Sequence, residues 1–287
     1  MELRPYQVKA IEAIHREWNE GHKNTLLVLP TGTGKTVVFA KVVENRVKGG
    51  GRALILAHRG ELLEQASSKL KMASGLDTAL EKATSSSIGS LLPVTVASVQ
   101  TLSQEKRLTQ FPSDYFTTIV VDEAHHCMSD TYQRILKYFE NANVLGVTAT
   151  PDRADHRNLG QFFDSKAYEY SINQAVREGY LCPVKAQMIP LELNISNVGI
   201  SNGDYAVGEV GSALEPYLEQ IAKEMLTYCK GRKTVVFLPL VKTSQKFCEL
   251  LNSYGMNAVE VNGNSKDREQ ILKDLYKSDD SWDIAIL

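Results

Sequence analysis

The sequence has few of the features that mark secreted or membrane-spanning proteins. Its four cysteines are far apart and form no Cys-x-x-Cys pair, which argues against a disulfide framework and favours reduced thiols. No apolar run approaches the roughly 20 residues of a membrane span, and the first residues do not resemble a signal peptide. We therefore expect a cytoplasmic protein without a membrane partner.

A cluster of zinc ligands is also poorly supported. His125, His126 and Cys127 are consecutive, but no second pair of ligands occurs at a spacing that is usual for zinc. The sequence therefore gives little reason to expect a structural zinc ion.

The chain also lacks an excess of charge of one sign. It has 32 Lys and Arg residues against 34 Asp and Glu residues, so no global field attracts nucleic acid. The distribution is uneven, because residues 1–60 contain ten Lys or Arg against five Asp or Glu, whereas residues 186–222 contain neither Lys nor Arg. A local basic surface in the first part is compatible with these counts, and so are ordinary solvated faces.

The apolar residues predict alternating helices and strands over the first half of the chain. The 287 residues are 43% apolar and 23% charged, as in ordinary globular proteins, and this length favours two domains. The predicted helices are 4–18, 36–47 and 60–72, and the predicted strands are 24–29, 52–57, 94–97, 117–121 and 143–148. Because these strands are continuously apolar, we expect an α/β fold, with a parallel sheet between helices and ligands at the carboxyl ends of its strands.

After Pro151 the pattern becomes less regular and then resumes. Residues 191–195 alternate like a strand, residues 194–208 are rich in Gly and Asn, and a helix is predicted over 215–230. The predicted strands that follow are 234–238, 258–261 and 283–287, separated by helices over 242–253 and 266–276. Because only 57 residues make up 231–287, this second α/β domain is expected to be incomplete.

A glycine-rich loop follows the first predicted strand. In Pro30-Thr31-Gly32-Thr33-Gly34-Lys35-Thr36, the glycines let backbone N–H groups approach phosphate oxygens at the start of a helix. Lys35 can reach the β- and γ-phosphates of a nucleoside triphosphate, and Thr36 can place its hydroxyl on Mg²⁺. The longer P-loop pattern has a glycine where this chain has Leu29, so only the short Gly-x-Gly-Lys-Thr form is present. The strand before the loop and the helix after it support nucleotide binding.

Two carboxylates follow the predicted strand 117–121. Asp122 would lie beside the glycine-rich loop if the two strands are neighbours, and its carboxylate would hold Mg²⁺ through water. Glu123 is the better candidate to orient or deprotonate the attacking water. An Asp-Glu pair after a strand is also a common helix start, but beside a phosphate-binding loop ATP hydrolysis is the better interpretation.

Over residues 3–151 the chain resembles superfamily-two helicases and translocases of the DEAH-box type. The segments that carry the resemblance are Arg4 to Gln7, Pro30 to Thr36, Ala57 to Leu62, Ala97 to Thr101, Asp122 to His125 and Thr148 to Pro151. Their combination is most similar to the branch that holds restriction-enzyme motor subunits and duplex-DNA repair helicases. The resemblance implies a RecA-like P-loop NTPase domain that uses ATP and Mg²⁺.

The resemblance also implies a role for each motif residue. Gln7 would bind the edge of the adenine and Arg4 would frame it, while Lys35 and Glu123 would be catalytic. The other implied roles are nucleotide binding by Thr31, Gly32, Thr33, Gly34 and Thr36, metal binding by Thr36 and Asp122, coupling by His125, Thr148 and Thr150, and nucleic-acid contact by His58, Arg59, Gln100 and Thr101. Taken singly, Arg59 is equally a solvated helix start, and Gln100 a neighbour of a helix cap.

The family pattern divides the chain into three parts. These are a RecA-like ATP-binding domain over 1–182, a connecting region over 183–230 and a partial second RecA-like domain over 231–287. Motifs V and VI are missing, and motif VI carries the arginine fingers, which typically contribute about 10³–10⁵ to the hydrolysis rate. We therefore expect a fragment that binds ATP and hydrolyses it weakly.

The predicted function is that of an ATP-dependent helicase or translocase. Its partner would be a nucleic acid, with DNA favoured, although backbone-tracking residues do not distinguish DNA from RNA. Two alternatives stay open, namely a nucleotide-binding module that switches a protein partner and an ATPase completed in trans by a partner's arginines. The sequence does not settle polarity, strand separation against translocation, or oligomeric state.

Overall fold

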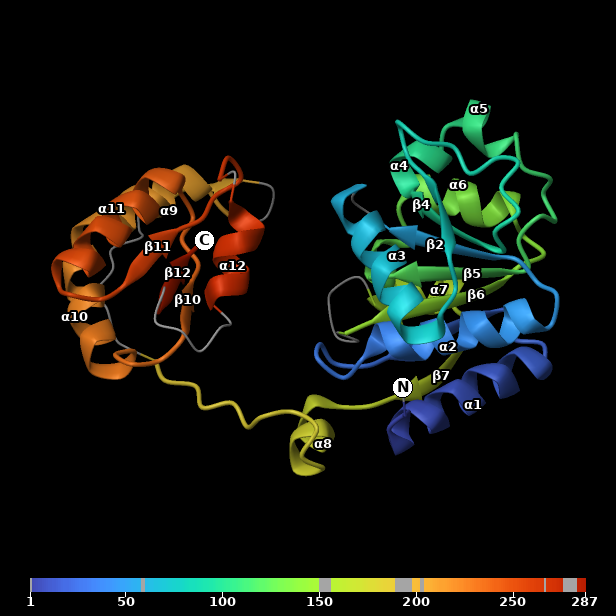
Figure 1. The fold of residues 1–287 in the computed structure, drawn as a ribbon, viewed down its shortest axis with the longest axis horizontal. Helices are drawn as coiled ribbons and strands as arrows, with labels where there is room; N and C mark the ends of the chain where they lie inside the picture. The colour runs from blue at the N-terminus through green and yellow to red at the C-terminus, as the bar shows by residue number, and fades with distance from the viewer. Residues whose placement is uncertain are drawn as a thin grey trace. The chain divides into compact units, whose positions relative to one another are not determined.

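The computed structural model describes residues 2–57, 60–149, 156–188, 198–201, 204–265, 267–275 and 283–287. The chain forms two compact units, Met1–Lys185 and Ala186–Leu287, each described here by itself (Figure 1). None of the helices in these ranges is long and apolar enough to cross a membrane. The strand predicted over 191–195 lies outside the described residues, and the boundaries at 182 and 230 stay predictions.

Unit 1 is built on a seven-stranded sheet in the order β3-β4-β2-β5-β6-β1-β7. All its neighbouring strands are parallel. The strands are β1 Asn24–Val28, β2 Ala53–Ala57, β3 Thr78–Glu81, β4 Val94–Ser98, β5 Thr118–Asp122, β6 Asn143–Thr148 and β7 Ser165–Glu169. The five strands predicted from apolar runs are all present, and the edge strands β3 and β7 are additional.

Helices cover both faces of this sheet (Figure 1). They are α1 Pro5–Asn19, α2 Lys35–Lys48, α3 Gly60–Ser74, α4 Val99–Leu102, α5 Glu105–Leu108, α6 Asp130–Tyr138, α7 His156–Phe162 and α8 Ile172–Arg177, with a 3₁₀ turn, η1, at Ala124–His126. Helices α1, α2 and α3 share one apolar core with the sheet, and α4, α5, α6 and α7 share the other. The α/β fold class predicted from the sequence is therefore confirmed.

Successive side chains from Leu26 to Leu29 pack alternately into the two apolar cores on opposite faces of the sheet. Leu27 and Leu29 belong to the core under α1 and α2, whereas Leu26 and Val28 belong to the core under α6 and α7. Since successive side chains of a strand point to opposite faces, both faces must be apolar when both are covered.

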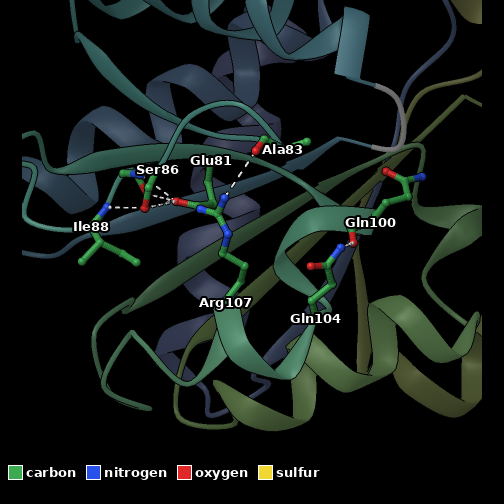
Figure 2. A network of polar contacts seen from close by, with 8 residues as sticks. Glu81, Ala83, Ser86, Ile88, Gln100, Gln104 and Arg107 are labelled. Carbon is green, nitrogen blue, oxygen red and sulfur yellow. Dashed lines mark hydrogen bonds and ion pairs between the residues drawn. The ribbon is translucent and has the colours of Figure 1, made fainter.

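A buried carboxylate at the end of β3 fixes the edge of the sheet near α4 and α5 (Figure 2). Glu81 is fully buried, and its oxygens accept hydrogen bonds from Arg107 Nη1 at 2.8 Å, from the Ser87 backbone N–H at 2.6 Å and from the Ser87 hydroxyl at 3.0 Å. The same guanidinium donates to the carbonyl of Ala83 at 3.4 Å. These contacts tie the loop after β3 to α5.

Replacing Arg107 with methionine is expected to destabilise unit 1 by about 2–3 kcal/mol, because Glu81 would then be a buried charge without its cationic partner. The measurement is urea-induced unfolding followed by circular dichroism. Lys82→Met is the matched control, since Lys82 on the same loop pairs with an exposed carboxylate of Glu64 and should leave the midpoint nearly unchanged. Equal midpoints for the two variants would contradict the structural role of the Glu81–Arg107 pair.

Unit 2 contains a three-stranded parallel sheet in the order β10-β12-β11. Its elements are β8 Ile200–Ser201, β9 Asp204–Tyr205, α9 Val207–Leu214, η2 Glu215–Tyr217, α10 Leu218–Tyr228, β10 Thr234–Val236, α11 Val241–Ser253, β11 Ala258–Glu260, α12 Arg268–Leu275 and β12 Ile284–Ile286. The helix predicted over 215–230 begins instead with the 3₁₀ turn η2, which contains Pro216. Helix α10 shares its core with α11, through Leu218, Met225 and Phe247 among others.

Candidate active site

The glycine-rich loop lies between the end of β1 and the start of α2 in unit 1. Gly32 and Gly34 both have positive φ, 85° and 82°, which L side chains adopt at a cost. Among the described residues, no backbone carbonyl accepts a hydrogen bond from the N–H groups of Gly32, Gly34, Lys35 or Thr36. The loop therefore presents unpaired backbone donors at a helix start, which is the arrangement that favours a phosphate.

The side chain of Thr33 points into the protein. It is fully buried, and its hydroxyl donates to the carbonyl of Pro30 at 2.6 Å. The carbonyl of Thr33 accepts two hydrogen bonds, from the Tyr6 hydroxyl at 2.6 Å and from Gln7 Nε2 at 3.0 Å. The backbone N–H of Thr33 donates to the Pro30 carbonyl at 3.3 Å, so the side chain and both backbone groups of Thr33 are bonded within unit 1. Of the other loop residues predicted to bind nucleotide, Thr31 is exposed and the side chains of Lys35 and Thr36 are half-buried.

The two residues before the loop that were predicted to bind adenine lie at the start of α1. Gln7 is buried, and its Oε1 accepts from the backbone N–H of Arg4 at 2.9 Å while its Nε2 donates to Thr33. Arg4 is exposed, and its guanidinium lies 5.1 Å from the ring centre of Tyr180. A side-chain amide can accept two hydrogen bonds at its oxygen and donate two from its nitrogen. Gln7 uses one of each, so one acceptor position and one donor position remain for a base.

The order of the strands places the acidic pair close to the loop, but not on the adjacent strand. The condition stated from the sequence, that the strand of Asp122 neighbours the strand of the loop, is wrong, because β6 pairs with both β1 and β5 and lies between them. Thr148, at the end of β6, is buried, and its carbonyl accepts from the Leu29 N–H at 3.0 Å. Asp122 is thus two strand spacings from the loop, about 10 Å, a gap that a hydrated cation spans.

Burial raises the pKa of the Asp122 carboxyl above its usual range, and the nearby charge of Glu123 adds to the rise. The backbone N–H of Glu123, 3.0 Å from Asp122 Oδ1, and the charge of Lys35 lower this pKa. Because the folded state binds this proton more tightly than the unfolded chain, its stabilising contribution is lost as pH rises through the raised pKa. At neutral pH a divalent cation beside Asp122 would offset the cost of its buried charge.

Glu123 is the only residue other than glycine in the described chain with a positive φ, at 53°. Such a conformation costs roughly 1–2 kcal/mol, and strain of this kind is often found at functional sites. Its carboxylate is half-exposed and lies 3.5 Å from Nδ1 of His125. The backbone thus turns Glu123 toward solvent at the end of β5, where a water molecule can reach it.

The donor set fits a nucleoside triphosphate with Mg²⁺. The loop supplies unpaired N–H groups and the ammonium of Lys35, and the Thr36 hydroxyl and the buried Asp122 carboxylate are oxygen ligands of the kind that Mg²⁺ prefers. Among the described residues, His125, His126 and Cys127 do not form a group whose ligand atoms lie close enough together to hold a metal ion.

The residues predicted to contact nucleic acid are only partly described. Gln100 in α4 is exposed, and its Oε1 accepts from the Ser98 hydroxyl at 2.9 Å, whereas Thr101 is buried. His58, Arg59 and Thr150 lie outside the described residues. Of the three residues predicted to couple the site to the nucleic acid, only His125 and Thr148 have a position here, one beside Glu123 and one beside the loop.

The sequence analysis missed Tyr6 as a contact of the phosphate-binding loop. Its hydroxyl bonds to the Thr33 carbonyl, and its ring stacks on that of Tyr170 at 4.4 Å. Tyr6 is adjacent to Gln7 in the motif, but no spacing in the sequence indicates that its hydroxyl reaches the loop or that Tyr170 supports it.

Comparison with known proteins connects this site to a family. The family described as "Type III restriction enzyme, res subunit" matches residues 1–153. A Saccharomyces cerevisiae protein that carries the name of an ATP-dependent helicase, IRC3, is 30% identical over 94% of this chain and 42% of its own length. The endonuclease subunit of the Escherichia coli type I restriction enzyme EcoAI is 26% identical over 92% of this chain and 35% of its own length.

A solved structure also shares the fold. The structure described as a fragment of an HsdR subunit of a type I restriction enzyme from Vibrio vulnificus has a TM-score of 0.76, with 23% identity, over 99% of this chain and 53% of that one. The chain thus spans about half the length of this structure and less than half the length of the two relatives above. The chain belongs to the type III restriction enzyme res-subunit family, within the superfamily-two helicases that its motifs resemble.

Proposed function

We propose that this chain is an ATP-dependent translocase or helicase that moves along a nucleic acid, with DNA favoured over RNA. The observation that carries the proposal is the convergence of β1, β6 and β5. Their carboxyl ends bring the loop, Thr148 and Asp122 to one edge of the sheet, where the charge of Lys35 acts on Asp122. Ligands of open α/β sheets bind at this edge.

Each residue at this edge has a proposed task in ATP hydrolysis. The loop N–H groups and Lys35 hold the phosphates of the bound ATP, and Thr36 and Asp122 hold Mg²⁺, which neutralises phosphate charge. Glu123 accepts a proton from the attacking water. Arg4 and Gln7 select the base.

The link to movement runs through residues next to the acidic pair. The Nδ1 of His125 lies 3.5 Å from the carboxylate of Glu123, and the Thr148 carbonyl accepts a hydrogen bond from Leu29, the residue just before the loop, so both respond to the state of the site. We assign these two residues and Thr150 to coupling, and Gln100, Thr101, His58 and Arg59 to contact with the nucleic-acid backbone. Figure 2 shows Gln100 next to Gln104, whose side-chain amide donates to the Gln100 carbonyl at 3.4 Å.

Turnover by the chain alone is proposed to be slow. After Arg177 the sequence has only Arg232 and Arg268, and neither lies in a context that matches an arginine finger. Without such an arginine the transition-state charge is less well stabilised.

The test is steady-state ATP hydrolysis by this chain, alone and with duplex DNA, single-stranded DNA or RNA. Glu123→Gln serves as the blank. Turnover above the blank that rises several-fold with DNA supports the proposal, and a larger rise with RNA would replace DNA by RNA. Nucleotide binding without any turnover or any effect of nucleic acid would contradict the motor function and favour a nucleotide-binding module that switches a protein partner.

A further inference from the structure

The carbonyl of Thr33 is the point at which the rest of unit 1 holds the phosphate-binding loop. The hydroxyl of Tyr6 donates to it at 2.6 Å, and Tyr6 is only 3% exposed. A carbonyl fixed in this way also fixes the peptide unit that it shares with Gly34, and so the direction in which the Gly34 N–H points. The position of Tyr6 therefore bears directly on the donors that face a phosphate.

The ring of Tyr6 is held in turn by two tyrosines from the end of unit 1. Tyr170, just after β7, stacks on it with ring centres 4.4 Å apart and planes 8° apart, and Tyr180 meets it edge-on at 4.9 Å. Tyr170 is fully buried, and its hydroxyl donates to Oε2 of Glu178 at 2.7 Å. An unbroken chain of contacts therefore runs from Glu178 through Tyr170 and Tyr6 to Thr33.

The end of α8 returns the polypeptide to the loop. Gly179, with φ 76°, ends the helix, and the N–H groups of Tyr180 and Leu181 both donate to the carbonyl of Ala175, at 2.8 and 3.1 Å. This turn brings Leu181 against the loop, because a Cβ built on Gly32 would lie 3.1 Å from Leu181 Cδ2. The turn after α8 thus contacts the loop directly through Leu181, next to the glycine that must approach the phosphate.

We propose that the segment Tyr170 to Leu181 positions the phosphate-binding loop, with Tyr6 as the residue that transmits its effect to Thr33. This inference rests on the proposed function, in which the loop binds nucleotide. The same segment continues toward the end of unit 1. If the segment changes nucleotide affinity, then nucleotide binding changes the conformational equilibrium of the segment by the same free energy. Tyr6, Tyr170 and Leu181 are positioning residues, since they act on the nucleotide only through the loop.

The test is Tyr6→Phe, which keeps the aromatic stack and removes the hydroxyl that donates to the Thr33 carbonyl at 2.6 Å and accepts from Arg4 Nη1 at 3.3 Å. We expect the Kd for Mg²⁺-ADP, measured with a fluorescent ADP analogue, to rise about twofold to tenfold, the range of one net hydrogen bond. Because the chemistry is untouched, KM for ATP should rise while kcat changes less.

The chain offers a matched control in Tyr138→Phe. The Tyr138 hydroxyl donates to the Phe111 carbonyl, also at 2.6 Å, but Tyr138 lies at the end of α6, and this bond does not involve the loop. Removing this hydroxyl also removes one hydrogen bond of the fold. If the Tyr6 hydroxyl only stabilises the fold, the two variants should therefore have the same small effect on the Kd for nucleotide. We expect only Tyr6→Phe to weaken binding.

Two further variants test the rest of the segment. Tyr170→Phe removes the bond to Glu178, and Leu181→Ala removes the contact with Gly32, and each should weaken nucleotide binding in a chain that unfolds cooperatively like the wild type. If the wild type binds nucleotide and Tyr6→Phe, Tyr170→Phe and Leu181→Ala bind it equally well, the positioning role is overturned while the proposed function stands. If the wild type itself binds no nucleotide, both are overturned.

Discussion

Replacing Lys35 with alanine is expected to weaken the binding of Mg²⁺-ATP and Mg²⁺-ADP by about 10²- to 10³-fold, which is the usual effect of removing one partner from a desolvated charge pair. Lys35 is the first residue of α2, directly after Gly34, and its charge lowers the pKa of Asp122. In the variant, the carboxylates of Asp122 and Glu123 would face the phosphates without this cation. The affinity is measured by titration with a fluorescent nucleotide.

Lys41→Ala is the matched control for this experiment. Lys41 lies on the same helix, makes a partly buried ion pair with Glu44 at 2.9 Å, and is not part of the loop. The same substitution there should leave nucleotide affinity unchanged, while it tests any loss of helix stability. Equal affinities for Lys35→Ala and the wild type would remove Lys35 from the site and would leave the loop without its principal cation.

The central strands could be predicted from the sequence because a strand that is buried on both faces appears as a run of apolar residues. β2 is a continuous apolar segment, β1 is apolar from Leu26 onward, and the residues of both strands are nearly all buried. β7 carries Lys166 and Glu169, is paired on one side only, and is half-exposed, so neither an apolar run nor an alternation marks it. The edge of a sheet is less constrained in composition than its centre, and β3 and β7 were missed for this reason.

Helix α6 shows a signal that was present but not used. Tyr132, Ile135 and Leu136 are spaced at three and four residues, all three are buried, and Ser129 stands at the N-cap position. This is the pattern that predicts an amphipathic helix. The absence of α6 from the expected elements is therefore an error of interpretation rather than a limit of the sequence.

The candidate site also has one part that could be predicted from the sequence and another part that could not. The loop and the acidic pair were recognisable because phosphate and Mg²⁺ binding restrict residue types at adjacent positions in the chain. The insertion of β6 between β1 and β5, and the contact of Tyr6 with Tyr170 across 164 residues of sequence, depend on long crossovers. Nothing local in the sequence encodes a strand order, so the distance between Asp122 and the loop had to come from the structure.

Replacing Glu123 with glutamine is expected to lower kcat for ATP hydrolysis by about 10²- to 10⁴-fold while nucleotide affinity stays within about twofold of the wild type. The amide keeps the shape of the side chain and the backbone position at φ 53°, but it cannot accept a proton from water. Loss of its negative charge also removes a cause of the raised pKa of Asp122, so Asp122 ionises more readily in the variant. Binding should therefore be retained, and the nucleotide-bound state should accumulate.

The comparison that isolates this role is Glu12→Gln, which makes the same change on the exposed face of α1 and should leave kcat and affinity unaltered. Affinity and single-turnover hydrolysis measured on the same preparations separate binding from chemistry. If the Glu123→Gln chain hydrolysed ATP at the wild-type rate, another group would have to accept the proton from the attacking water. Of the described residues, His125 would then be the first to replace, because its Nδ1 lies 3.5 Å from the carboxylate of Glu123.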